Sequence, residues 1–369
     1  MKSTSKEKKL FTPGPLTTSK TVKQSMLRDF GSRDKEFISS VENIREKLLE
    51  LAEVTKGNYE TILMQGSGTF GIESVICSTV PFNGKLLVII NGAYGHRINR
   101  IAERLGIETL ELIYDEDSIP NVSDIDKTLA ANNEITNVAV VHCETTTGII
   151  NPILEIGKVI KKYNAEYIVD AMSSFGAYEI NLEENKIDFL ISSANKCIEG
   201  VPGFSFVLAK TEVLKTKQNY SKSTSLDLYD QWMGLEKNGQ FRFTPPTHSL
   251  IAFKQALNEL DKEGGIPGRA ERYMNNHSVL TEGMAELGFV EYIDRQHQGY
   301  IITSFLYPEH NNFSFEKFYN LLSEKGLVIY PGKLSNVDCF RIGNIGHLFE
   351  IDMNEILDAI KEVKKEMNF

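Results

Sequence analysis

Short apolar runs alternate with longer stretches of helical period over roughly the first 250 residues of the chain. The short runs are apolar throughout rather than at every second position. This is typical of strands that helices cover on both faces of a parallel sheet. The pattern therefore predicts an α/β domain around a long, mostly parallel, seven-stranded sheet. Its strands are expected at residues 61–65, 85–90, 109–114, 137–142, 166–170, 188–193 and 203–210.

The pattern changes after about residue 247, where two long helical stretches, 249–265 and 267–288, follow each other. Two strand-like runs and two further helical stretches come next, which predicts a smaller α+β domain at the C-terminal end. A glycine- and proline-rich segment at 264–268 marks the boundary between the two domains. We expect an extended, turn-rich N-terminal arm at 1–30, a large domain at 31–262 and a small domain at 263–369.

Length and charge narrow the classes of protein to be considered. A chain of 369 residues exceeds what one ordinary core supports, which agrees with two domains. The net charge of −10 argues against general binding to nucleic acid or to an anionic membrane, so any anionic ligand must be held by local groups. No apolar signal segment follows the basic first nine residues, and no run has the length of a membrane span. We expect a cytoplasmic protein.

The cysteines are scattered without the C-x-x-C spacing of metal sites. This distribution suits reduced thiols in the core better than disulfides or a zinc site. The segment "HCE" at 142–144 has no spaced partner for a metal either, so no metal is predicted. The four cysteines are Cys77, Cys143, Cys197 and Cys339.

The segment "GSGTFG" at 66–71 lies between a predicted strand and a helix, and its glycine spacing fits a dinucleotide-binding turn. Such a site needs an acidic residue after the second strand to hold the ribose, but the strand at 85–90 is followed by "NGAY". A nicotinamide dinucleotide is therefore disfavoured. Backbone N–H groups of Ser67, Gly68 and Thr69 at a helix N-terminus can still hold a monophosphate. A tight turn without a ligand stays an alternative.

Two residues further along decide between phosphate-bearing cofactors. Asp170 ends the apolar strand at 166–170, and Lys196 follows the strand at 188–193 in a Ser/Asn/Gly setting. Pyridoxal phosphate catalysis requires a Schiff-base lysine, a carboxylate that keeps the pyridine nitrogen protonated, and a phosphate anchor. Such groups converge at the carboxyl ends of strands in an open α/β sheet. The order of phosphate loop, aspartate and lysine predicts a fold-type-I pyridoxal phosphate enzyme.

Eight segments, in order along the chain, resemble the class V aminotransferases. The resemblance runs from about Leu10 to the C-terminus, and it is strongest with the branch of the family that uses 2-aminoethylphosphonate and pyruvate. The alanine–glyoxylate and serine–pyruvate enzymes are more distant relatives. The segments are "TPGPLTTSKTVKQSM", "GSGTFGIES", "NGAYGHRINRIAERLG", "HCETTTGIINPI", "YIVDAMSSFGAY", "SSANKCIEGVPGFSFVLAK", "FTPPTHSL" and "FRIGNIG".

The resemblance implies a role for each matching residue around pyridoxal 5'-phosphate. Lys196 is the implied Schiff-base lysine, and Asp170 the implied partner of the pyridine nitrogen. Tyr94 is expected to stack on the cofactor ring, and Thr145 to contact its O3′ side. Phosphate contacts are implied for Ser67, Gly68, Thr69, Ser193 and Asn195.

The resemblance also implies a homodimer with shared active sites. The segment "FTPPT" matches one that reaches the partner subunit's cofactor phosphate, which makes Thr244 a donor in trans. Arg341 matches the arginine that receives the acidic group of the substrate, and a guanidinium binds carboxylate or phosphonate equally well. Arg33 and Arg242 are candidate helpers.

The implied activity is a transamination in two halves. 2-Aminoethylphosphonate gives its amino group to the cofactor and leaves as phosphonoacetaldehyde, and pyruvate then takes the amino group to become alanine. The same chemistry serves phosphonate breakdown or, in reverse, synthesis. An alanine- or serine–glyoxylate (or –pyruvate) aminotransferase is the alternative within the family. A nicotinamide-dependent oxidoreductase and a non-catalytic binding protein are the alternatives outside it.

Overall fold

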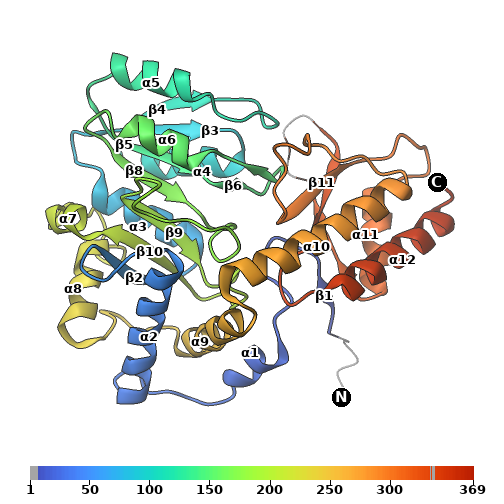
Figure 1. The fold of residues 1–369 in the computed structure, drawn as a ribbon, viewed down its shortest axis with the longest axis horizontal. Coiled ribbons are helices and arrows are strands. Elements are labelled where there is room, and N and C mark those ends of the chain that lie inside the picture. The colour runs from blue at the N-terminus through green and yellow to red at the C-terminus, as the bar shows by residue number, and fades with distance from the viewer. Residues whose placement is uncertain (1–6, 333, 335–336) are drawn as a thin grey trace.

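A large α/β part and a smaller α+β part lie side by side (Figure 1). The computed structural model describes residues 7–332, 334 and 337–369, so the first six residues of the expected arm lie outside the described chain. Within that part of the chain, no helix is long and apolar enough to cross a membrane.

The large part is built around one seven-stranded sheet in the order β2-β10-β9-β8-β5-β3-β4. Strands β4, β3, β5, β8 and β9 run parallel to one another, whereas β10 runs antiparallel to both β9 and β2. The prediction of a mostly parallel seven-stranded sheet is therefore confirmed. The strands are β2 Tyr59–Gln65, β3 Lys85–Ile90, β4 Glu108–Ile113, β5 Ile135–Val141, β8 Glu166–Asp170, β9 Phe189–Ser193 and β10 Phe204–Lys210.

Helices cover the sheet on both faces, and all strands except the edge strand β4 are almost wholly buried. Helix α3 packs on β9 and β10, α4 on β3 and β4, and α6 on β8. This two-sided burial explains why the strand runs are apolar throughout. The helices of this part are α2 Lys35–Leu51, α3 Gly68–Thr79, α4 Ala93–Arg104, α5 Val122–Ala131, α6 Ile153–Ile160, α7 Thr211–Leu214, α8 Leu228–Asn238 and α9 Thr247–Lys262, with a 3-10 turn at Lys215–Lys217.

The smaller part has its own apolar cluster, which is separate from the core around the large sheet. Its three-stranded sheet has the order β11-β14-β13 and is antiparallel. Helix α10 begins directly after Gly264, inside the segment predicted as the boundary. The division at residue 262 stays a prediction. The elements are α10 Gly265–Glu286, β11 Ile302–Leu306, α11 Phe315–Glu324, β12 Leu327–Val328, β13 Tyr330–Pro331, β14 Cys339–Gly343 and α12 Glu350–Met367.

The N-terminal arm joins the two parts. Its strand β1 (Lys9–Leu10) pairs with β12, and Phe11 is buried in the smaller cluster. Its helix α1 (Lys20–Ser25) packs against α9 of the large part. The sequence pattern missed α1, α2 and a short hairpin of β6 (Cys143–Glu144) and β7 (Ile149–Ile150).

Candidate active site

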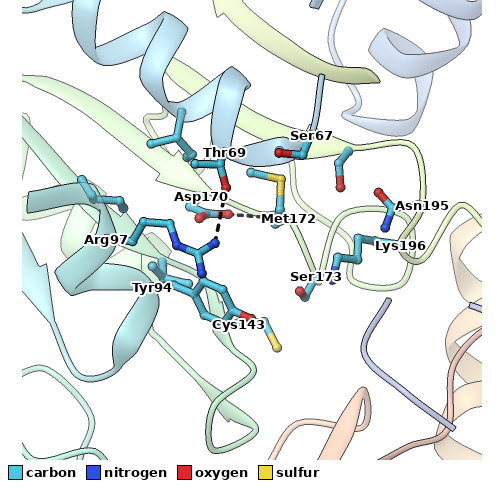
Figure 2. A pocket seen from close by; sticks show the side chains of 15 residues that line it. Ser67, Thr69, Tyr94, Arg97, Cys143, Asp170, Met172, Ser173, Asn195 and Lys196 are labelled. Carbon is cyan, nitrogen blue, oxygen red and sulfur yellow. Dashed lines mark hydrogen bonds between the residues drawn. The ribbon is translucent and has the colours of Figure 1, made fainter. Parts of the chain in front are cut away.

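A cavity of about 300 Å³ opens where the parallel strands of the large sheet end (Figure 2). Tyr94 and Arg97 lie on one side of Asp170, and Lys196 lies on the other. Eight residues that the sequence predicted for the site line this cavity together: Ser67, Gly68, Thr69, Tyr94, Asp170, Ser193, Asn195 and Lys196.

The glycine loop places the N-terminus of α3 at the cavity. Ser67 is the residue that precedes the helix, and its side chain makes no capping bond, so the first N–H groups of α3 are available to a ligand. A Cβ on Gly68 would lie 2.2 Å from Met172 Sδ, which explains why glycine occupies this position. A Cβ on Gly71 would lie 2.8 Å from Ser205 Oγ, on a strand beneath the helix. Gly71 therefore serves packing rather than ligand binding.

Asp170 is the last residue of β8 and is buried at the floor of the cavity. Its Oδ1 accepts a hydrogen bond from Met172 N at 2.9 Å. Burial raises the pKa of Asp170 to about 6, while this hydrogen bond and the charges of Arg97 and Lys196 oppose the rise. A cationic ligand atom beside Asp170 would restore the full negative charge of the carboxylate.

Lys196 extends from the turn after β9, and the N-terminal arm covers its end. The ammonium Nζ donates a hydrogen bond to the backbone oxygen of Pro13 at 2.5 Å. Burial lowers the pKa of Lys196 to about 8, and the charge of Arg341 acts in the same direction, whereas Asp170 opposes it. The lowered pKa increases the neutral fraction of the amine near neutral pH, and the neutral amine is the form that acts as a nucleophile.

The sequence reasoning missed Arg97 and Glu144, which support Tyr94 from two sides. The guanidinium of Arg97 lies 4.8 Å from the centre of the Tyr94 ring, and its Nη1 donates to Thr69 Oγ1 at 3.3 Å. Arg97 follows Tyr94 by one helical turn of α4, a spacing that could have revealed this pair. Glu144 is fully buried and accepts from Tyr94 N at 3.0 Å and from Thr146 Oγ1 at 2.8 Å. Burial raises the pKa of Glu144 to about 7.

Thr145 and Arg341 lie together beside the cavity rather than among the residues that line it. Arg341 is buried on β14, and its Nη1 donates to the backbone oxygen of Thr145 at 2.8 Å. Its Nε donates to the backbone oxygen of Pro331 at 3.0 Å. The buried Oγ1 of Thr145 has no hydrogen-bond partner among the described residues. Buried hydroxyls are normally hydrogen-bonded, so this one is available to a ligand.

Thr244 does not reach the cavity of its own chain. It is exposed, and its backbone oxygen accepts from Gln65 Nε2 at 3.3 Å, just before the glycine loop. Arg242, one of the two candidate helpers, is occupied by Asp230 and stacks on Phe243, and the other, Arg33, is exposed. Any role of Thr244 at a cofactor therefore requires a second chain.

The residues of the cavity fit pyridoxal phosphate and not a dinucleotide. A helix N-terminus suits one phosphate, and a buried carboxylate and a buried lysine lie on the cavity wall. Asn91 follows the end of β3, at the position where a dinucleotide site has an acidic residue. Its Nδ2 donates to Asn151 Oδ1 and to the backbone oxygen of Ser118. His142 of the segment "HCE" is a core residue that bonds Ser174 Oγ at 2.9 Å.

Comparison of the sequence with known families matches residues 17–341 to the family "aminotransferase class-V". A 2-aminoethylphosphonate–pyruvate transaminase from Bacillus cereus is 54% identical over 352 residues, which cover 95% of this chain and 96% of the relative. The relative of the same name from Bacillus thuringiensis (strain Al Hakam) is 53% identical over the same shares of both chains.

Solved structures with this fold include two aminotransferases. The ureidoglycine–glyoxylate aminotransferase from Bacillus subtilis superimposes with a TM-score of 0.91 at 24% identity, over 100% of this chain and 96% of that one. The pyridoxamine–pyruvate aminotransferase from Mesorhizobium loti gives a TM-score of 0.89 at 21% identity, over 100% and 95%. At these identities the two structures support the fold alone.

Proposed function

The chain is a member of the class V aminotransferase family, and from this premise we propose that it transfers the amino group of 2-aminoethylphosphonate to pyruvate. The products are phosphonoacetaldehyde and L-alanine, and the cofactor is pyridoxal 5'-phosphate. The observation that carries the choice of substrates is the 54% identity, over almost the whole of both chains, to a relative that bears this activity as its name. Alanine- and serine-using enzymes of the family remain the second candidates.

Residues of the cavity supply what the cofactor needs. Pyridoxal phosphate, when bound, acts as the electron sink that allows a proton to leave the carbon bearing the amino group. Ser67, Gly68 and Thr69 would hold its phosphate through the N-terminus of α3, with Ser193 and Asn195 as further donors. Tyr94, held by Arg97 and Glu144, would present its ring to the cofactor ring.

Asp170 and Lys196 would carry the proton chemistry. Asp170 would accept a hydrogen bond from the pyridine nitrogen and keep that nitrogen protonated, since an adjacent positive charge favours the ionised carboxylate. Lys196 would hold the cofactor through Nζ. The same Nζ, as a neutral amine, would act as the general base that accepts the proton from the substrate carbon.

Arg341 would receive the acidic end of either substrate. Its side chain donates hydrogen bonds to two backbone oxygens. Its positive charge helps to lower the pKa of Lys196, so the two groups are close enough to contact one small substrate. A guanidinium fork binds a phosphonate in one half of the reaction and a carboxylate in the other. Thr145 Oγ1 would complete the cofactor's O3′ side.

The proposal includes a homodimer in which Thr244 acts on the cofactor phosphate of the partner subunit. Its exposure beside Gln65 and the exposed ring of Phe243 support an interface at this segment. We also propose that the enzyme works in the cytoplasm, where its four buried cysteines stay reduced. The proposed partners are small molecules and a second copy of the chain. We propose no binding to nucleic acid or to a membrane.

One experiment tests the substrates. Purified enzyme loaded with pyridoxal phosphate is mixed with 2-aminoethylphosphonate and pyruvate, and alanine and phosphonoacetaldehyde are followed together. We expect both products in equal amounts, and none with Lys196→Ala. If alanine or glycine forms only from serine–pyruvate or alanine–glyoxylate pairs, the substrate assignment is wrong and the second candidate holds. Running the reaction from phosphonoacetaldehyde and alanine compares the two directions.

A further inference from the structure

Glu199 is a buried carboxylate three residues after Lys196. Its backbone has a left-handed φ of 65°, which is unusual for a residue other than glycine, and its N–H donates to the backbone oxygen of Lys196 at 2.7 Å. Its side chain is 3% exposed, so it faces the interior rather than solvent. The turn that carries Lys196 therefore ends in a charged group that the proposed chemistry does not use.

Helix α10 supplies the partners of this carboxylate. Glu199 Oε1 accepts from Tyr273 Oη at 2.6 Å and from Arg272 Nη2 at 2.7 Å. Arg269, one helical turn earlier on α10, lies 3.5 Å from the same oxygen and donates to the backbone oxygen of Cys197. The turn that carries Lys196 is thus bonded to α10 through the side chain of Glu199 and the backbone oxygen of Cys197.

The same side chains of α10 hold the loop that follows β14. Arg272 Nη1 donates to the backbone oxygens of Gly346 at 2.6 Å and of Leu348 at 2.8 Å. The N–H of Gly346 donates to Tyr273 Oη at 3.1 Å. Because β14 carries Arg341, one cluster links the segment that positions the lysine to the segment that positions the acid-binding arginine.

A contribution to stability does not explain why this cluster consists of charged residues. Arg269 and Arg272 are paired with Glu199 and Glu263, and burying such groups costs about as much as their attraction returns. A charged, directional cluster does fix geometry. Small substrates must meet Lys196 at one end and Arg341 at the other, so the spacing between these two groups has to be constant.

We propose that Glu199 is a positioning residue that, through Tyr273 and Arg272, holds Lys196 at a fixed place relative to Arg341. This inference rests on the proposed roles of Lys196 and Arg341. When the link is broken, the turn of Lys196 loses its anchor on α10 while the phosphate site at α3 keeps its structure. Lysine chemistry should then slow far more than phosphate binding weakens, because α3 holds the phosphate and only Asn195 of the phosphate donors lies next to Lys196.

Two variants test the proposal in the full-length enzyme. Tyr273→Phe removes the hydroxyl that bonds Glu199 and Gly346 and leaves the ring in place. Glu199→Gln keeps the shape of the side chain and removes its charge. The matched control is Tyr59→Phe, which removes another buried hydroxyl, the donor to Ile187 O at 2.9 Å, remote from the cavity. If Glu199→Gln does not fold, Tyr273→Phe still carries the test.

Three measurements separate positioning from general support. Both variants should slow the appearance of lysine-bound cofactor absorbance in apoenzyme, and lower kcat, by about 10-fold to 100-fold. Binding of pyridoxamine 5'-phosphate, which has the phosphate but cannot bond to lysine, should change much less than these two rates. Tyr59→Phe should lower the melting temperature without changing either rate.

The proposal is overturned if both variants lose only stability, as Tyr59→Phe does, and keep wild-type rates. A failure of the proposed function is distinguishable from this outcome. In that case the wild-type enzyme itself would not form phosphonoacetaldehyde and alanine, or Lys196→Ala would keep the activity, whatever the behaviour of the two variants at Glu199 and Tyr273.

Discussion

At the scale of single residues, burial acts on Lys196 and Asp170 in opposite ways. It lowers the pKa of the lysine to about 8 and raises the pKa of the carboxyl to about 6, because it disfavours the charged form of each. The attraction between them reduces both shifts. Both groups are therefore mostly charged between about pH 6 and pH 8, and a mostly neutral amine coexists with the ionised carboxylate above about pH 8.

The rate at which apoenzyme captures pyridoxal phosphate should report the pKa of Lys196. Only the neutral amine attacks an aldehyde, so the rate should rise with pH and level off above about pH 8. The growth of lysine-bound absorbance after rapid mixing measures this rate across the pH range. A rate that is still rising towards the ordinary lysine value of 10.5 would show that burial does not control the amine.

Glu144 should make the stability of the apoenzyme fall as pH rises. Its pKa is raised from 4.5 to about 7, so its contribution is fully present below about pH 4.5 and is lost as the carboxyl ionises towards pH 7. Relative to Glu144→Gln, the wild-type protein should lose on the order of 3 kcal/mol over this window.

Urea unfolding of both proteins at several pH values measures the difference. Replacement of the exposed Glu155 by Gln controls for the loss of one negative charge from the molecule. A difference between wild type and Glu144→Gln that does not change with pH would contradict the prediction.

At the scale of elements, α3 combines two tasks that its glycines divide between them. Its N-terminus faces the cavity at Gly68, and its next turn rests on β9 and β10 at Gly71. The glycine spacing in "GSGTFG" resembles a dinucleotide turn because both kinds of site need a helix N-terminus close to a sheet. The spacing alone therefore does not identify the cofactor.

Replacing Gly71 by Ala should destabilise the protein although alanine favours helices. The new methyl group would lie 2.8 Å from Ser205 Oγ and 3.0 Å from Ile191 Cγ2, which forces α3 away from the sheet. We expect a loss of about 1–3 kcal/mol in the free energy of unfolding.

Chemical denaturation measures this loss of stability, and two further variants serve as a control and as a compensating change. Gly234→Ala on α8 is the control, because its nearest neighbour is the flexible side chain of Arg242, and it should be neutral or slightly stabilising. Adding Ser205→Gly to Gly71→Ala should restore part of the lost stability. Equal stability of Gly71→Ala and wild type would show that α3 can shift without cost.

At the scale of the whole molecule, the proposed homodimer would give each chain parts of two active sites. One would be its own cavity, and the other would include the exposed segment around Thr244 of the same chain. In a two-fold dimer the same exchange occurs in both directions, so the sites are complete only in pairs. The exposed aromatic ring of Phe243 beside Thr244 suits a contact that a second copy would bury.

Mixed dimers should recover activity that each parent lacks. The Lys196→Ala chain has an intact Thr244, and the Thr244→Ala chain has an intact Lys196, so a mixed dimer holds one complete site. We expect Thr244→Ala alone to weaken cofactor binding by about 10-fold to 100-fold, the loss of one hydrogen bond to a charged group. At limiting cofactor, mixed dimers should reach about half the wild-type activity.

Co-expression with two different affinity tags allows the mixed dimers to be purified and assayed. If they are no more active than the Thr244→Ala parent at the same cofactor concentration, Thr244 does not act across the interface. Size-exclusion chromatography with light scattering determines the mass of each preparation.

The fold class could be predicted from the sequence because the patterns that indicate it are local. Continuous apolar runs predicted all seven strands of the large sheet, and motif order placed the chain in its aminotransferase family, as the comparisons confirm. The order of the strands was not predictable, since it depends on pairing between distant segments such as β2 and β10. Helices α1 and α2 were missed in the arm and after it.

The sequence by itself determined the fold class, the family and eight of the residues that line the cavity, because strand ends, a glycine loop and a lone lysine are readable one at a time and the family motifs supply Tyr94, Ser193 and Asn195. Only the tertiary structure decided how these groups are held. The bond from Tyr94 N to Glu144 and the bond from Tyr273 of α10 to Glu199 join segments that lie far apart in the sequence, so no local spacing reveals them. Burial, which sets the pKa values of Lys196 and Asp170, likewise exists only once the chain has folded.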